Sequence, residues 1–216
     1  MLSILLNIAA HCGVFCLMDA ILDRIGLKGI YYLIHSIHNT AIVYYTGTEV
    51  YQSLMNFPSI AQSSTNMQAL QICFALHIYH IVMYWRKFRM DDWLHHGLMI
   101  GIALPMGGYL PSGSLLGYSL FFTTGLPGMV DYGLLFLVRN NWLDKDIEKR
   151  VNAWLNVWIR SPGCVSHATL VCAYASTLHA PTLLFLCGAY ITACLTYWNG
   201  QYFMRQIVYD VGSRQI

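Results

Sequence analysis

Seven apolar segments, each about long enough to cross a bilayer as a helix, dominate this sequence. A bilayer core requires about 20 apolar residues per helix. Hydrophobic residues make up 56% of the chain and charged residues only 10%, against roughly 25% charged in a soluble domain. So few charges cannot cover a water-exposed surface. We therefore expect an all-α integral membrane protein, with residues 1–216 forming a single polytopic domain, and neither a soluble enzyme nor a nucleic-acid-binding protein. The segments lie near Leu2–Leu22, Ile30–Met55, Met67–Trp85, Trp93–Tyr109, Leu115–Val138, Pro162–Leu178 and Pro181–Met204.

The basic residues divide the segments into two sides. All twelve Lys and Arg follow the first, third, fifth or seventh segment, and the connections on the other side contain none. Such an excess of positive charge marks the cytosolic or matrix side of a membrane. The division requires an odd number of spans and so supports seven. It predicts an N-terminus on the neutral (outer or lumenal) side and a C-terminus on the positive side, in the endoplasmic reticulum or an organelle inner membrane.

One further segment has an amphipathic pattern. In IEKRVNAWLNVWIR (Ile147–Arg160), apolar residues recur at helical spacing and basic residues stand among the polar positions. This pattern is typical of a helix that lies in the membrane interface. We expect an interfacial amphipathic helix on the positive side; the alternative is an extension of the sixth span.

Polar side chains in six segments fall at a similar depth near the positive side. Ionisable groups inside spans cost several kcal/mol and are usually functional or paired. A single histidine in a span is often a hydrogen-bonded packing residue, but scattered packing residues have no reason to share a layer. The pairs His35/His38 and His77/His80 have i,i+3 spacing and each share a helix face. We expect a polar chamber open to the positive side and lined by His35, His38, Asn39, His77, His80, His95, His96, Asp131, His167, Asn199 and Tyr202.

Several cofactor classes fit the sequence poorly. A retinal Schiff base requires a lysine in the seventh segment, and that segment has none. Histidine-box di-metal enzymes use HxxxH and HxxHH spacings, whereas the pairs here are HxxH, HxxH and HH. Facing histidine pairs can hold a metal or the axial positions of haem, but this spacing does not demand either. We therefore assign no metal ligands and disfavour haem.

A basic and acidic loop leads into a His-His pair at the start of an apolar helix in YWRKFRMDDWLHHGLMI (Tyr84–Ile100). This stretch resembles the TLC domain, a membrane module that includes the ceramide synthases. The stretches HSIHNTAIVYYTG (His35–Gly47), TTGLPGMVDYGLLFLVR (Thr123–Arg139) and WNGQYFMRQIV (Trp198–Val208) are also similar to that family. The resemblance covers about Tyr31–Val208 and implies a TLC-like helical bundle.

The resemblance also implies an activity. In ceramide synthases, two histidines and an acidic pair transfer an acyl group from acyl-CoA to an amine. By analogy, His95, His96 and Asp131 are the catalytic candidates, and acyl-CoA or an acyl lipid is the ligand. A histidine can act as general base near neutral pH, and a buried carboxylate can orient it.

The family motif is incomplete in this chain, because Pro127 and Gly128 stand where the family has a His-Asp pair. The alternative function is therefore a non-catalytic accessory subunit of a larger membrane complex. Its partners are then other membrane subunits as well as membrane lipids.

Overall fold

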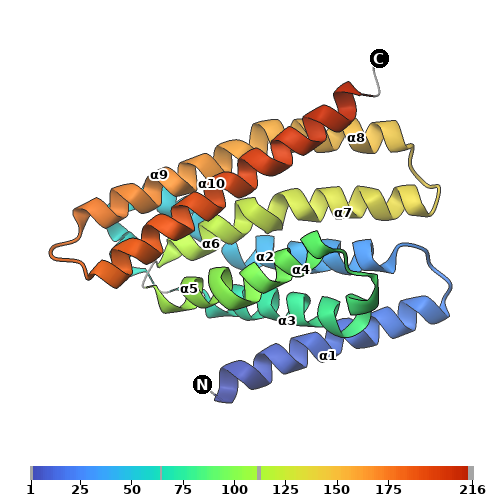
Figure 1. Ribbon diagram of the computed structural model, residues 1–216, viewed down its shortest axis with the longest axis horizontal. Helices are drawn as coiled ribbons and strands as arrows, with labels where there is room; N and C mark the ends of the chain where they lie inside the picture. Colours follow the sequence, from blue (N-terminus) through green and yellow to red (C-terminus); the bar gives the residue numbers. More distant parts are fainter. Residues whose placement is uncertain (1, 64, 111–112, 214–216) are drawn as a thin grey trace.

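The fold is a bundle of helices whose axes run roughly side by side (Figure 1). The computed structural model describes residues 2–63, 65–110 and 113–213, and these residues form helices without any strand. The α-helices are α1 (Leu2–Arg24), α2 (Ile30–Met55), α3 (Met67–Tyr84), α4 (Met90–Leu98), α5 (Leu104–Tyr109), α6 (Ser114–Leu120), α7 (Leu126–Arg139), α8 (Lys145–Leu155), α9 (Ser161–Thr177) and α10 (Leu183–Gly212). Short 3-10 helices cover Phe57–Gln62 and Trp85–Lys87.

All seven predicted segments are helical, and four helices are long and apolar enough to cross a membrane. These four cover Leu2–Arg24, Met67–Lys87, Ser114–Arg139 and Leu183–Gly212. The chain is thus a membrane protein by the length and composition of its helices. Helix α2 begins and ends at the predicted residues but is not among the four. We attribute this to its polar residues, which include His35, His38 and Asn39, and which lie buried inside the bundle.

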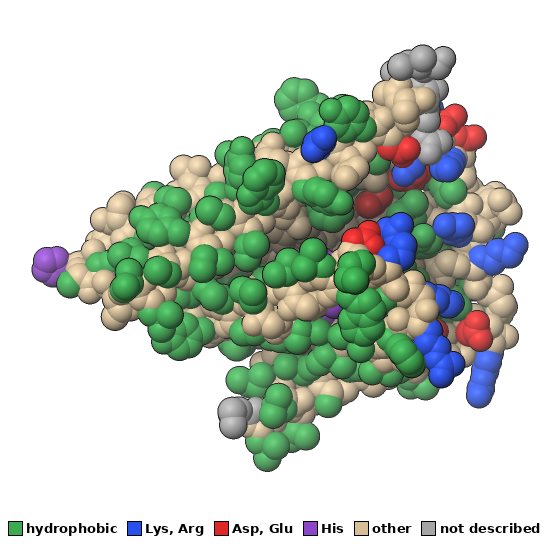
Figure 2. Space-filling view, in the orientation of Figure 1, with side chains coloured by type: hydrophobic (Ala, Val, Ile, Leu, Met, Phe, Trp, Pro, Cys, Tyr) green, Lys and Arg blue, Asp and Glu red, His purple; other side chains and the backbone are tan. Residues whose placement is uncertain are grey.

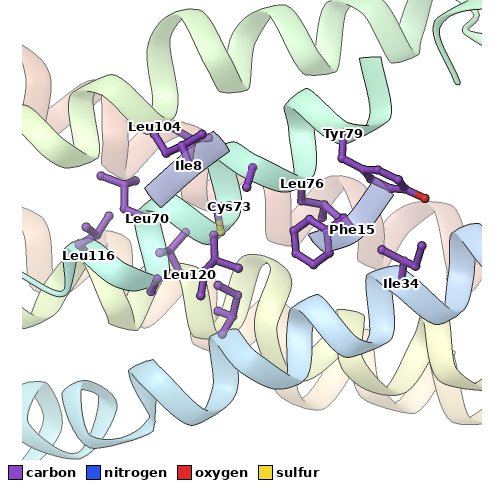
Figure 3. Close-up of a cluster of buried hydrophobic side chains, with 14 of the residues drawn as sticks. Ile8, Phe15, Ile34, Leu70, Cys73, Leu76, Tyr79, Leu104, Leu116 and Leu120 are labelled. Carbon is purple, nitrogen blue, oxygen red and sulfur yellow. The ribbon is translucent and has the colours of Figure 1, made fainter. Parts of the chain in front are cut away.

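Helix α2 lies at the centre of the bundle. It packs against α1 and α3 on one side and against α6 and α7 on the other, while α9 and α10 pack against each other. Apolar side chains of α1, α2, α3, α5 and α6 form one core, in which Phe15, Ile34, Leu76 and Tyr79 are buried (Figure 3). This core fixes α3 against α2 and so positions the histidines of both helices.

Positive charge gathers at one end of the bundle. Figure 2 shows Lys and Arg concentrated at the end where, in Figure 1, α7 ends and α8 begins. Arg24 and Arg139 lie in the last turns of α1 and α7, and Lys145 begins α8. Large apolar side chains cover much of the remaining surface in this view. A lipid environment accommodates such a surface, whereas water does not.

Three π-helical segments join helices that would otherwise be separate. They are Met99–Ala103 between α4 and α5, Phe121–Gly125 between α6 and α7, and Asn156–Arg160 between α8 and α9. Each ends two residues before a proline: Pro105, Pro127 and Pro162. Proline has no N–H to donate, and its ring clashes with the carbonyl four residues earlier. The wider π turn accommodates that clash without ending the helix.

The expectation of a separate interfacial helix at Ile147–Arg160 is wrong. Helix α8 continues through the π segment into α9, so this region extends the sixth predicted span. Its polar face also does not face water: Glu148, Asn152 and Asn156 are buried, whereas Val151 and Trp154 are exposed. The polar face packs inward against α7 and α10, because other polar groups lie there.

Candidate functional site

Five of the predicted histidines lie in one cluster, which we call the histidine cluster: His35, His77, His80, His95 and His96. The Nδ1 atoms of His77 and His96 are 2.9 Å apart. The rings of His35 and His80 stack with their centroids 4.3 Å apart. The ring of His95 lies 5.2 Å from that of His77. Helices α2, α3 and α4 thus contribute side chains to a single site.

The local sequence explains this convergence. His77 and His80 are one turn apart on the buried face of α3. The chain then turns, and α4 begins with a capping box in which the Asp92 carboxylate accepts a hydrogen bond from the Arg89 N–H. His96 lies one turn after Asp92 and faces α3, with Phe88 stacked on its ring at 4.7 Å. His95, the residue directly before His96, is exposed.

Aromatic rings fill the space around the cluster. Tyr31 lies 4.1 Å from His35 and 4.9 Å from His80, and Tyr132 of α7 lies 4.3 Å from His35. These distances between ring centroids correspond to packing contact. This part of the predicted chamber is therefore occupied by side chains.

Some buried nitrogens of the cluster have no hydrogen-bond partner. His80 is 2% exposed, and neither of its ring nitrogens has a hydrogen-bond partner among the described residues. A neutral imidazole has one N–H donor and one nitrogen acceptor. Leaving such a group unsatisfied in the interior costs about 1–3 kcal/mol. The site therefore contains buried coordinating capacity that no described residue uses.

The structure separates Asp131 from His95 and His96. Asp131 Oδ1 accepts a hydrogen bond of 2.6 Å from Asn152 Nδ2 of α8. Among the described residues, Asp131 makes no hydrogen bond with a histidine. The expected His–Asp pair does not form, because Asp131 faces α8 while the adjacent Tyr132 packs on His35.

Asp131 belongs instead to a polar ladder on α8 and the following π segment, formed by Glu148, Asn152, Asn156 and Arg160. Asn156 Nδ2 donates to the Asn152 carbonyl at 2.9 Å. Arg160 donates from Nη1 to Asn156 Oδ1 and from Nη2 to the Thr123 carbonyl, both at 3.1 Å. That carbonyl lies four residues before Pro127, which has no N–H to offer it. Sequence analysis missed this ladder, although its i,i+4 spacing is visible, because the polar face was assigned to water.

Among the described residues, the other predicted chamber residues make no hydrogen bond or ring contact with the histidine cluster. His38 Nδ1 is 2.9 Å from Asn39 Oδ1, which also accepts a hydrogen bond from Thr124. His167 is buried on α9 beside the Tyr118 ring of α6, with centroids 6.0 Å apart. Asn199, on α10, is half-buried.

The placement of Tyr202 in the chamber is wrong. Its side chain is 55% exposed on the outer side of α10. The predicted layer is thus several separate polar sites and not one continuous chamber.

A pocket of about 480 Å³ lies beside the histidine cluster at the positively charged end. Its lining includes Asp19, Asp23, Tyr31, Tyr84 and Lys87, from α1, α2, α3 and the 3-10 turn that follows α3. Asp19 is buried and accepts hydrogen bonds from the hydroxyls of Tyr79 and Tyr84. Tyr31 contributes to both the pocket and the cluster. A second pocket, of about 600 Å³, includes Thr48, Glu49 and Asn66 and belongs to the opposite end of α2.

Comparison with protein-family models, with curated proteins and with solved structures finds no match for this chain.

Proposed function

We propose that the protein crosses the membrane seven times as a TLC-like bundle, with its N-terminus on the neutral side and its C-terminus on the positive side. The proposal is supported by the helicity of all seven apolar segments, by the charge at one end of the bundle and by the motifs around His35, His95 and Asp131. The start of α1 and the end of α10 also lie toward opposite ends of the bundle (Figure 1).

Protease protection in sealed membranes tests this topology. A tag at the N-terminus and a tag at the C-terminus are expected to show opposite accessibility. Equal protection of the two tags would contradict an odd number of spans.

Within that topology, the function that the geometry supports best is the binding of an acyl lipid at the pocket between α1, α2 and α3. The observation that carries this proposal is the lining of that pocket. Asp19 and Asp23 offer carboxylates to a cationic head group, and Lys87 offers a cation to a phosphate. Leu27, Ile30 and Met83 provide an apolar wall for the first methylenes of a chain. An amine-bearing lipid head group matches this combination.

Binding is better supported than acyl transfer. The Nδ1 atom of His96 faces that of His77, and Asp131 is engaged by Asn152. A general base oriented by a carboxylate, as acyl transfer of the ceramide-synthase type requires, is therefore not assembled from His95, His96 and Asp131 in this arrangement. Acyl-CoA remains a ligand class that only the resemblance suggests.

One observation favours the second candidate, an accessory subunit of a larger membrane complex. The layer around His35 and His80 is filled by packed rings, as expected where a family fold is kept for assembly. Mild native purification followed by mass spectrometry distinguishes the candidates, because a stoichiometric lipid supports the first and a stoichiometric protein partner supports the second.

The lipid proposal is tested with Asp23→Asn. Asp23 lines the pocket and is exposed to it, so its replacement leaves the helix packing intact. Both proteins are purified and placed in nanodiscs that contain phosphatidylethanolamine and phosphatidylglycerol. The Asp23→Asn variant is expected to retain several-fold less phosphatidylethanolamine than the wild-type protein. The matched control is Asp91→Asn, an exposed carboxylate that pairs only with the exposed Arg89 among the described ion pairs. Equal retention by the two variants would contradict the pocket as the binding site.

A further inference from the structure

The histidine cluster contains three imidazoles that converge in the way metal ligands do. His77 and His80 come from α3, and His96 comes from α4. One ring nitrogen from each lies within 4.8 Å of the others, and all three residues are buried. Because His96 comes from a different helix, the spacing of neighbouring histidines in the sequence cannot reveal this set.

One of the distances within this trio is close to that of a coordination sphere. Zinc binds imidazole nitrogen at about 2.0–2.1 Å in tetrahedral geometry, which places two ligand nitrogens roughly 3.3 Å apart. The Nδ1 atoms of His77 and His96 are 2.9 Å apart. Small side-chain rotations therefore suffice to convert this contact into two bonds to an ion.

The hydrogen-bond pattern is a second, independent observation. Both ring nitrogens of His80 are buried, and no residue that the structure describes forms a hydrogen bond with either of them. A bound cation would accept the lone pair of one of these nitrogens and so remove part of the free-energy cost of burying the imidazole without partners. Asp92, one turn before His96 on α4, brings negative charge to the same side of the site, and this partly offsets the charge of an ion in an apolar environment.

We propose that His77, His80 and His96 bind one divalent transition-metal ion of the zinc class. Imidazole ligands suit Zn²⁺, Cu²⁺, Ni²⁺ and Fe²⁺, whereas Mg²⁺ and Ca²⁺ require oxygen ligands that this trio lacks. Three ligands leave one tetrahedral position for a fourth. The exposed His95, whose ring lies 5.2 Å from His77, or a water molecule fills that position. This assignment does not depend on the lipid-binding proposal.

Metal titration of the purified protein tests the proposal. Protein in lipid-free detergent is treated with a chelator, dialysed and titrated with Zn²⁺, and bound metal is measured by elemental mass spectrometry. One ion per chain is expected, and Co²⁺ in its place should give the intense visible absorption of a tetrahedral site. Metal content far below one per chain after Zn²⁺ loading would overturn the proposal.

Variants assign the ligands. His80→Gln and His96→Gln are each expected to weaken Zn²⁺ binding by more than about 100-fold, since even changes to residues behind the ligands cost 10–100-fold. The matched control is His167→Gln, which changes a buried histidine on α9 and should leave Zn²⁺ affinity unchanged. Wild-type affinity in His80→Gln or His96→Gln would overturn the assignment.

A spectroscopic measurement covers the case in which these variants fail to fold. X-ray absorption of the Zn²⁺-loaded wild-type protein should show nitrogen ligands with the outer-shell scattering of at least three imidazoles. A first shell dominated by sulfur or by carboxylate oxygen would overturn the proposal. All of these measurements omit lipid, so failure of the pocket to bind lipid leaves their outcome unaffected.

Discussion

Gly128 allows α7 to approach α2 closely. A Cβ at this position would overlap the amide of Asn39, which is fully buried and accepts a hydrogen bond from Thr124. The space beside Gly128 is thus occupied by a side chain of α2. Small residues of this kind let membrane helices approach closely.

We expect Gly128→Ala to lower the free energy of unfolding by about 1–3 kcal/mol, because overpacking forces Asn39 out of its hydrogen bonds. Gly47→Ala on α2 is the control: nothing lies within 4 Å of a Cβ there, so alanine should stabilise the helix by up to about 1 kcal/mol. Unfolding in detergent measures both variants. Equal effects of the two substitutions would contradict the close packing at Gly128.

Asp131 is expected to act through its hydrogen bond to Asn152. Asp131→Asn keeps an oxygen that accepts from Asn152 Nδ2, whereas Asp131→Ala removes it and leaves the buried Nδ2 with its longer, 3.4 Å hydrogen bond to Glu148 Oε1. The alanine variant should therefore be less stable than the asparagine variant by about 1–3 kcal/mol. Thermal unfolding of the two proteins compares them directly. The reverse order would show that an acceptor for Asn152 does not stabilise the fold at this position.

At the scale of elements, the π segments connect helices through the carbonyls that proline leaves free. Arg160, in the π segment before α9, bonds simultaneously to Asn156 and to the Thr123 carbonyl in the π segment before α7. The Phe203 ring of α10 lies 4.5 Å from its guanidinium carbon. One planar side chain thus joins three parts of the bundle.

Arg160→Lys tests this connection, because lysine keeps the charge but cannot direct two fixed donors at both acceptors. We expect the loss of at least one charge-assisted hydrogen bond, worth about 1.5–3 kcal/mol, and a lower unfolding temperature. Arg150→Lys, an exposed position on α8, is the control and should change little. An unchanged midpoint for Arg160→Lys would show that the two acceptors are satisfied in another way.

The positions of the helices were more predictable from sequence than the partners that each helix face contacts. Hydropathy fixed the helices because apolar length is a local property, and α2 matches its predicted bounds. The i,i+3 pairing of His77 with His80 was also visible. The partner of Asp131 was not, because it depends on how α7 packs against α8. The surroundings of the polar face of α8 were missed for the same reason: amphipathicity defines two faces but does not say whether the polar one contacts water or other helices.

At the scale of the whole molecule, the bundle is apolar outside and holds polar groups as well as apolar cores between its helices. Exposed Leu5, Tyr44, Trp154 and Leu183 illustrate the outer surface, and buried His80, Asn152 and Thr196 the interior. Polar contacts between helices contribute to stability in a bilayer, where the hydrophobic effect no longer drives helices together. Much of what fixes this fold is therefore contact between residues far apart in the chain.

The inward polar face of α8 has a consequence for biosynthesis. As the chain is made from its N-terminus, Asp131 of α7 is present before α8 appears, but Asp210 of α10, 3.2 Å from Lys149, is made last. A chain that ends after α9 should therefore insert into the membrane. In that chain Lys149 lacks the Asp210 carboxylate, and α9 lacks α10, against which it packs. We expect pulse-chase labelling to show faster degradation of that truncated chain than of the full chain, and equal half-lives would contradict this order. Completion of the last helix, and not insertion of the earlier ones, then decides when the newly made protein escapes degradation.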